Sequence, residues 1–164
     1  MITTQFASSS PSRQAIGLLG WVALCFVAAT TAFFVSADAW YTTLNKPSWN
    51  PPAWVFGPVW SLLYTLMAVA AWLVWRKGGW KSHGKILGVF LVQWFLNVLW
   101  TPLFFGLHSP GLAFAEIILL WIAIAVTSIL FWRVSKVAGF LLIPYLGWVT
   151  IAAVLNYTIW RLNV

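Results

Sequence analysis

Five apolar stretches, each 20 to 24 residues long, dominate the chain and are separated by shorter polar segments. Glu116 is the one formal charge that falls inside any of them. About 20 residues of helix cross the hydrocarbon core of a bilayer, and backbone groups in hydrocarbon must be satisfied within their own segment. The sequence therefore predicts an all-α integral membrane protein, a five-transmembrane-helix bundle. The expected helices are Ala15–Ser36, Trp54–Trp75, Ile86–Phe105, Leu112–Trp132 and Val137–Trp160.

The composition excludes a water-soluble enzyme. Of the 164 residues, 62% are hydrophobic and 7% are charged, whereas a soluble domain carries about a quarter charged residues. The single cysteine, Cys25, excludes an internal disulfide and a cysteine-rich zinc or iron–sulfur site. The two histidines, His83 and His108, fall in predicted loops. We therefore expect no metal site and no axial ligand for haem iron.

The basic residues are distributed unevenly between the two sets of connections. Seven of the nine Lys and Arg lie in the N-terminal tail and the second and fourth loops, and two lie in the first loop and the C-terminal tail. The positive-inside rule places the set of seven, and with it the N-terminus, in the cytoplasm. The net charge of +7 then reflects topology and attraction to anionic lipid headgroups, and nucleic-acid binding is not expected. The seven are Arg13, Arg76, Lys77, Lys81, Lys85, Arg133 and Lys136, and the two are Lys46 and Arg161.

The N-terminal apolar stretch has two interpretations. Ala37-Asp38-Ala39 resembles a signal-peptidase site, but an apolar run of about 22 residues exceeds the 7–15 of a signal peptide. We therefore keep this stretch as the first membrane helix of a single domain, 1–164, preceded by a disordered tail over residues 1–14.

Residues 37–53 form a connection rich in proline and tryptophan. Pro47, Pro51 and Pro52 fix the backbone and remove three amide donors. The segment should be extended and stiff, and its rings can lie at the headgroup level or fold over the mouth of the bundle. A simple aromatic anchor is the alternative to a lid.

Four groups of residues carry a resemblance to the TspO/MBR family of tryptophan-rich sensory proteins and translocator proteins (peripheral-type benzodiazepine receptors). The similarity runs from the first helix to the C-terminus in the order and spacing of that family. The groups are Trp40-Tyr41-x-x-Leu44-x-Lys46-Pro47-Ser48-Trp49-x-Pro51-Pro52-x-Trp54-Val55-x-Gly57-Pro58-Val59-Trp60, Asn97-x-x-Trp100-x-Pro102-x-Phe104-Phe105-Gly106, Pro144-Tyr145-x-x-Trp148 and Leu155-Asn156-Tyr157-x-x-Trp160-Arg161.

The resemblance implies five tightly packed helices and a ligand pocket that the first loop closes. It also implies binding of porphyrins such as protoporphyrin IX, of haem-related tetrapyrroles and of isoquinoline or benzodiazepine drugs, with homodimers usual and sterol bound by the mitochondrial members. No resident cofactor is required. The charge distribution favours the bacterial cytoplasmic membrane, with the C-terminus outside, and an outer membrane is the alternative that the family leaves open.

The residues themselves also point to a pocket. Measured along ideal helices, the candidate side chains lie about 8 to 18 Å below the outer face. Phe56, Trp60 and Tyr64 share one helix face, and Gln93, Asn97, Trp100 and Phe104 share another, as do Tyr145, Trp148, Ala152 and Asn156. The expected ligand-binding residues are Tyr41, Trp60, Tyr64, Asn97, Trp100, Trp148 and Ala152.

A pocket of indoles with a few amides and phenols suits a large, flat, apolar ring system held by stacking. The ligand's carboxylates would remain near the headgroups or meet donors of the first loop, including Lys46. The amides of Gln93, Asn97 and Asn156 should face the bundle interior, where interhelical hydrogen bonding is the alternative to ligand binding. Trp94 and Trp121 are deep as well, and they either fill core or meet lipid.

Three further features are weaker signals. Glu116 is expected to play a structural role, with a proton relay as the alternative. Leu155, Tyr157 and Arg161 fit a sterol-recognition pattern that matches many unrelated helices. Gly84 and Gly88 allow close helix approach, either in a homodimer or within one chain.

Three classes of function remain open from the sequence. The first is a membrane receptor or carrier that binds tetrapyrroles and regulates their level or transport. The second is a light- and oxygen-dependent porphyrin-degrading enzyme, for which the resemblance suggests Trp60 and Trp148 as candidate catalytic residues. The third is a structural or regulatory membrane partner.

Overall fold

The computed structural model describes residues 10–34 and 39–164, and within these residues the regular structure is entirely helical. The elements are α1 (Pro11–Phe34), α2 (Ala39–Thr43), α3 (Ala53–Trp75), α4 (Gly79–Thr101), η1 (Pro102–Gly106), α5 (Pro110–Val134), α6 (Lys136–Leu141) and α7 (Ile143–Leu162). Five segments are long and apolar enough to cross a membrane: Pro11–Thr31, Ala53–Trp75, Gly79–Gly106, Pro110–Val134 and Lys136–Leu162. The chain is therefore an integral, multi-pass membrane protein built as a five-helix bundle.

The expected N-terminal tail is only partly testable. Residues 1–9 and the predicted end of the first helix at Ser36 lie outside the described residues. Residues 11–14 are helical, so the prediction of a disordered tail up to residue 14 is wrong for them. Pro11 explains the earlier start, because a proline is tolerated in the first turn, where its missing amide has no helical partner.

The third membrane helix, α4, begins seven residues before the predicted Ile86. Lys81, His83 and Lys85 made this region look like a loop, but α4 starts at Gly79 and carries them on its first turns. Gly79 has φ +63, a left-handed conformation that glycine adopts without strain, and it ends the tight turn from α3. His83 therefore lies in a helix, at a kink with φ −122 and ψ 17, and its assignment to a loop is wrong.

Prolines locate two interruptions that the hydrophobic pattern does not reveal. At Pro102 the α4 helix passes into the π-turn η1, in which the amide of Leu107 donates to the carbonyl of Pro102 at 2.9 Å. The last span breaks at Leu142 into α6 and α7, and Pro144 lies in the first turn of α7. The connection 37–53 is likewise not all loop, since its Ala39–Thr43 portion forms the short helix α2.

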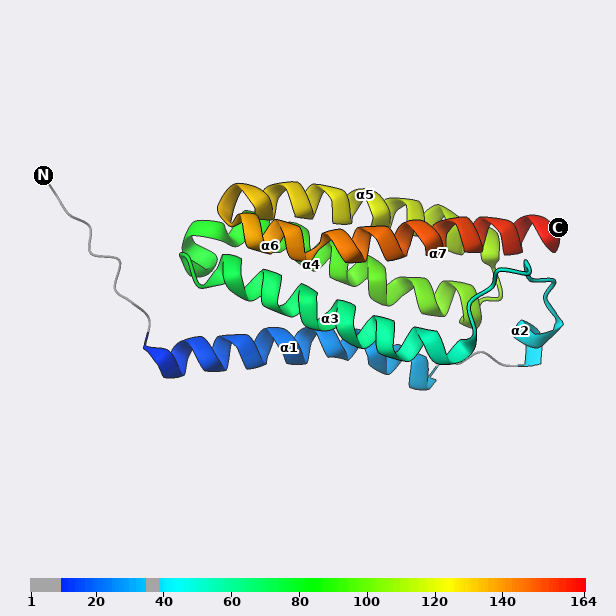
Figure 1. Cartoon of the computed structure of the whole chain (residues 1–164), viewed down its shortest axis with the longest axis horizontal. Coiled ribbons are helices and arrows are strands. Elements are labelled where there is room, and N and C mark those ends of the chain that lie inside the picture. The colour runs from blue at the N-terminus through cyan, green and yellow to red at the C-terminus, as the bar shows by residue number, and fades with distance from the viewer. Residues whose placement is uncertain (1–9, 35–38) are drawn as a thin grey trace, which may run out of the picture.

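The helices form a bundle in which α3 packs against α1, α4 and α6, and α5 packs against α4, α6 and α7. We call residues 39–52, which contain α2, the lid. The bundle end that holds α2 and the C-terminus is the lid end, and the end that holds the turn 76–78 is the turn end (Figure 1). At the turn end Lys77 donates to the carbonyl of Val134 at 2.7 Å, so the two connections on that side meet. The N-terminal end of α1 and the C-terminus lie at opposite ends of the bundle, as five crossings require (Figure 1).

Candidate ligand-binding cavity

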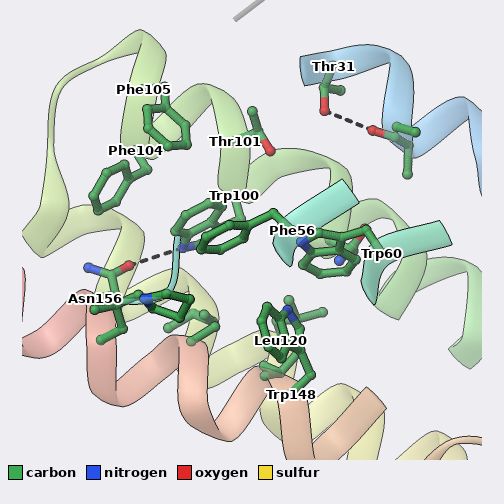
Figure 2. Close-up of a pocket in the computed structure, with 18 of the residues that line it drawn as sticks. Thr31, Phe56, Trp60, Trp100, Thr101, Phe104, Phe105, Leu120, Trp148 and Asn156 are labelled. Atoms are coloured by element: carbon green, nitrogen blue, oxygen red, sulfur yellow. Dashed lines mark hydrogen bonds between the residues drawn. The ribbon is translucent and has the colours of Figure 1, made fainter. Parts of the chain in front are cut away.

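A cavity of about 570 Å³ lies in the half of the bundle toward the lid end. It is bordered by α1, α3, α4, η1, α5 and α7, and by Tyr41, Asn50 and Pro51 from the segment that contains α2. Figure 2 shows rings from several helices, among them Trp60, Trp100 and Trp148, gathered around one space. This volume is within the range of sites that hold cofactors and drug-sized molecules.

The structure brings all seven of the expected ligand-binding residues to this one cavity. Tyr41 comes from α2, Trp60 and Tyr64 from α3, Asn97 and Trp100 from α4, and Trp148 and Ala152 from α7. The two candidate catalytic residues, Trp60 and Trp148, are therefore in the same site. Three helix faces that sequence periodicity singled out separately do converge.

Hydrogen bonds between helices orient the polar groups of the wall. The Tyr64 hydroxyl donates to Asn97 Oδ1 at 3.2 Å, and Trp100 Nε1 donates to Asn156 Oδ1 at 3.0 Å. Asn156 Nδ2 in turn donates to the carbonyl of Pro110 at 2.7 Å, which joins α7 to the start of α5. Figure 2 shows the bond from Trp100 to Asn156 at one side of the cavity. These amides both line the cavity and bridge helices, so the two roles that the sequence left open coexist.

Aromatic contacts brace the cavity between α3 and α7. The rings of Phe56 and Trp148 meet edge to face with centroids 5.8 Å apart. Trp60 stacks on Tyr64 at 5.3 Å on the neighbouring side of α3. Such pairs prefer offset-stacked or edge-to-face arrangements and resist sliding, so they define the shape of the space between the helices.

Two residues that share the predicted lining faces do not reach the cavity. Gln93 and Tyr145 are fully buried and are absent from its lining, and Gln93 Nε2 donates to the Tyr145 hydroxyl at 3.1 Å. Each lies one helical turn closer to the turn end than a residue that lines the cavity, because each helix face extends past the cavity toward the turn end. The expectation that their faces line the cavity throughout is wrong at these two positions.

The walls from α1 and α5 were not found from the sequence. Ala28, Ala29 and Thr31 line the cavity from α1, and Ile117 and Leu120 line it from α5. Small and aliphatic side chains are equally common facing lipid, so the sequence carries no signal that sets these positions apart. Their burial follows only from the packing of the helices.

The lid is held in place by contacts within itself and to the end of the chain. Lys46 Nζ donates to the carbonyls of Tyr41 at 2.6 Å and of Leu44 at 2.9 Å, and lies 4.5 Å from the centre of the Tyr41 ring. The Asn45 amide donates to Asn163 Oδ1, and Asn163 Nδ2 donates back to the Asn45 carbonyl, both at 2.9 Å. The Lys46 ammonium is thus engaged with lid carbonyls, which argues against its expected part in meeting a ligand's carboxylates.

Aromatic rings fasten the lid to η1 and to the connection that follows it. Trp40 stacks on His108 with centroids 4.3 Å apart, and Tyr41 meets Phe105 edge to face at 5.4 Å. Burial raises the pKa of the Tyr41 phenol above its usual range, so this hydroxyl stays neutral at physiological pH. The lid therefore adds a neutral aromatic surface to the cavity.

Of the weaker sequence signals, only Leu155 lines the cavity. Glu116 is 5% exposed on α5, and neither carboxylate oxygen has a hydrogen-bond partner in the structure. Leu155 lines the cavity while Tyr157 is 45% exposed on the outer side of α7, so the sterol pattern does not form one continuous surface with Arg161. A methyl group added at Gly88 would meet nothing within 4 Å among the described residues, so the Cβ position of this glycine faces open space.

Two other tryptophans, Trp94 and Trp121, have different surroundings. Trp121 is 37% exposed and donates to Thr150 Oγ1 at 2.9 Å, so it lies on the outer surface between α5 and α7. Trp94 is partly buried against the core, and its Nε1 has no partner in the structure. Neither lines the cavity.

The cavity lining is mainly aromatic and aliphatic, with a few uncharged polar groups. Among the described residues, the cavity wall holds no Asp, Glu, His, Lys or Arg, and no cluster of three potential metal ligands occurs. Indole and phenyl faces supply stacking, while amides and hydroxyls supply a few directional contacts.

Comparison with known proteins agrees with the motifs. The model of the TspO/MBR family matches residues 20–161. A tryptophan-rich protein TspO of Chlorobaculum tepidum is 44% identical over 157 residues, which is 93% of this chain and 99% of that relative. The protein CrtK of Rhodobacter capsulatus is 41% identical over 85% of this chain and 88% of its own length.

The similarity extends to animals. The human translocator protein is 41% identical over 143 residues, 85% of this chain and 83% of the human protein. The region that the family model matches holds all five membrane spans apart from residues 11–19 and residue 162, together with the lid and every residue that lines the cavity. The chain belongs to the TspO/MBR family.

Proposed function

We propose that this chain is a membrane receptor or carrier that binds porphyrins, such as protoporphyrin IX and haem-related tetrapyrroles, in the cavity under the lid. By this binding it regulates the level or the transport of the tetrapyrrole. Isoquinoline and benzodiazepine-type drugs are proposed to occupy the same space. No resident cofactor is involved, since the porphyrin is the ligand or the substrate.

The observation that carries the proposal is the chemistry of the cavity wall. About 570 Å³ is surrounded by indole, phenyl and phenol rings with no formal charge among the lining residues. A flat macrocycle buries a large apolar area against such rings, and its polar edges can reach Asn97, Asn156 and the lid. The names of the relatives support transport or sensing, because one is called a translocator protein and another a tryptophan-rich sensory protein.

A titration with protoporphyrin IX tests the proposal. We expect saturable quenching of tryptophan fluorescence in purified wild-type protein, and affinity at least about tenfold weaker in Trp60→Ala, which removes a stacking ring. Asn97→Ala should weaken binding by a smaller factor, in line with the loss of one hydrogen bond. The matched control is Trp132→Ala, since Trp132 is 47% exposed on α5 and lies outside the cavity.

Three outcomes would count against the cavity. Wild-type protein that shows no saturable quenching would refute porphyrin binding altogether and leave a structural or regulatory role in the membrane. Unchanged affinity in both Trp60→Ala and Asn97→Ala would place the ligand elsewhere. An equal loss in Trp132→Ala would show that the effect is not specific to the site.

Photo-oxidative breakdown of bound porphyrin by dioxygen is the second candidate function. Trp60 and Trp148 lie in the same cavity wall, and Trp148 Nε1 is buried without a partner in the structure. Oxidisable indoles held against a light-absorbing ligand are the feature that favours this candidate. Illumination should then produce a new bilin-like absorbance that is absent in the dark and lost in Trp60→Phe and Trp148→Phe, whereas unchanged product in these variants would reject the assignment.

For the membrane, we propose the bacterial cytoplasmic membrane with the lid end outside. Seven of the nine basic residues lie near the turn end, in the turn 76–78 or on the helix ends next to the connections, which matches a cytoplasmic face. A homodimer through α4 is proposed as well, because Gly88 leaves an open, unpacked surface on that helix.

Sterol binding is proposed only as a lipid contact of Tyr157 and Arg161, since Leu155 faces the cavity.

A further inference from the structure

The indole of Trp60 is held on two sides by tyrosines from different helices. Tyr64, one turn further along α3, stacks on it with centroids 5.3 Å apart and planes 29° apart. Tyr145, from α7, meets it edge to face at 6.2 Å and 67°. The orientation of the Trp60 ring plane is therefore set by two neighbours rather than by its own helix alone.

Both tyrosines are themselves fixed by amides of α4. The Tyr64 hydroxyl donates to Asn97 Oδ1 at 3.2 Å, and the Tyr145 hydroxyl accepts from Gln93 Nε2 at 3.1 Å. Asn97 and Gln93 are four residues apart, so they lie on one face of the helix. One α4 face thus holds a tyrosine of α3 and a tyrosine of α7 against the same indole.

Gln93 and Tyr145 act without touching the cavity. Both are fully buried and neither is among the lining residues, whereas Trp60 lines the cavity and is only partly buried. Gln93 contacts Tyr145 and Tyr145 contacts Trp60, so this chain of contacts connects Gln93 to the cavity wall. Gln93 and Tyr145 therefore support the cavity wall and are not part of it.

Gln93 is also a costly residue to bury. Its Oε1 has no hydrogen-bond partner in the structure, and a buried unsatisfied acceptor costs free energy. An apolar side chain of similar volume would avoid that cost in the middle of a membrane helix. Among the described residues, the one hydrogen bond of the Gln93 side chain is to Tyr145, and this contact therefore explains the presence of an amide at this position.

We propose that Gln93 and Tyr145 are positioning residues that determine ligand specificity by presetting the plane of Trp60 for a rigid, flat macrocycle. The inference rests on the proposed function, because it concerns how the same cavity selects its ligand. A wall fixed in advance spares the ligand the cost of ordering side chains on binding, and that advantage is greatest for a ligand that cannot adapt its own shape. An open-chain tetrapyrrole, which can adapt, gains much less from it.

The test compares two tetrapyrroles on Gln93→Leu and Tyr145→Phe. We expect the affinity for protoporphyrin IX to fall about five- to tenfold in each variant, the scale of ordering one or two side chains on binding. The affinity for biliverdin, an open-chain tetrapyrrole, should change less than about twofold. The double variant should bind protoporphyrin IX no more weakly than either single variant, since both changes break the same contact.

Thr127→Val is the matched control. Thr127 is also fully buried and polar, but it bonds only to the carbonyl of Ala123 in its own helix and does not line the cavity. Thr127→Val should leave the ratio of the affinities for protoporphyrin IX and biliverdin unchanged. A second readout is the ¹⁹F spectrum of protein labelled with 5-fluorotryptophan, in which the Trp60 signal, assigned with Trp60→Phe, should shift or broaden in Gln93→Leu and not in the control.

The outcomes separate this inference from the proposed function. If wild-type protein binds neither tetrapyrrole, the proposed function fails. If wild-type protein binds protoporphyrin IX and Gln93→Leu binds both ligands as wild type does, or weakens both equally, the positioning role is overturned. An unmoved Trp60 signal in a folded Gln93→Leu protein would overturn it as well.

Discussion

The two halves of the bundle are built from the same kinds of residue and differ in how closely the helices approach. Near the turn end, fully buried side chains such as Met67, Leu87, Phe90 and Phe131 fill the interior. Phe90 stacks on Phe131 at 5.7 Å and meets Trp21 edge to face at 5.6 Å. Near the lid end, rings of similar size surround about 570 Å³ of open space.

Small residues account for much of the difference. On α3, Ala68, Ala70 and Ala71 are fully buried and allow the neighbouring helices to come close, and α6 packs along this helix. Toward the lid end α3 and α7 meet instead through the rings of Phe56 and Trp148. Both halves contain mainly apolar side chains, so the packing of these side chains distinguishes the filled half from the half with the cavity.

The first test of this comparison opens a cavity in the packed half near the turn end. Phe90→Ala should destabilise the protein by about 3 kcal/mol, because the ring loses its packing contacts to Phe131 and Trp21 and the surrounding helices relax only partly. Unfolding in mixed detergent micelles would measure the change. Phe95→Ala on the same helix is the control, since Phe95 is 57% exposed to the surroundings of the bundle and should cost little.

A small effect of Phe90→Ala, comparable to that of Phe95→Ala, would mean that the turn-end half is as loosely packed as the half with the cavity. The contrast between the two halves would then not hold. Porphyrin affinity gives an independent check, because Phe90 does not line the cavity and the folded variant should bind as wild type does.

The second test fills the cavity near the lid end. Ala152→Phe should reduce porphyrin affinity by at least about tenfold, because the new ring occupies the volume of the ligand. The free energy of unfolding should change by less than about 1 kcal/mol, since the ring enters open space and need not displace a packed side chain. Parallel titration and unfolding experiments on one preparation would measure both quantities.

Ala68→Phe is the counterpart in the turn-end half. Ala68 is fully buried in the core, so the added ring has no space and should destabilise the protein by about 1–3 kcal/mol. If Ala152→Phe were the more destabilising of the two, the lid-end space would be filled in solution. Retained affinity in Ala152→Phe would instead place the ligand away from α7.

The sequence predicted the spans and the converging faces because both follow from simple periodicity. Uncharged stretches of about 20 residues identify membrane helices, and rings or amides spaced four apart identify a face. Trp60 and Tyr64 on α3, and Trp148 and Ala152 on α7, could therefore be placed before the structure was known. All of them line the cavity.

The rest of the site could not be predicted, because it depends on contacts between segments that are distant in the sequence. Nothing in the local pattern distinguishes Ala28 or Leu120, which line the cavity, from similar residues that face lipid. Gln93 and Asn97 share a face, yet one supports the wall from below and the other belongs to it. That distinction depends on how far along the bundle the cavity extends, which periodicity does not determine.

The smallest effect concerns the lid rather than the bundle. Lys46→Met keeps an unbranched side chain of similar length but removes the two hydrogen bonds from Nζ to the carbonyls of Tyr41 and Leu44. Bonds from a charged donor are stronger than neutral ones, but this site is only partly buried, so we expect porphyrin to dissociate a few-fold faster with little change in its association rate. Stopped-flow displacement would measure both rates. Lys81→Met is the control, because Lys81 lies exposed in the first turn of α4, away from the lid. Equal dissociation rates for wild type and Lys46→Met would show that the Trp40–His108 stack and the Asn45–Asn163 hydrogen bonds hold the lid without help from the lysine.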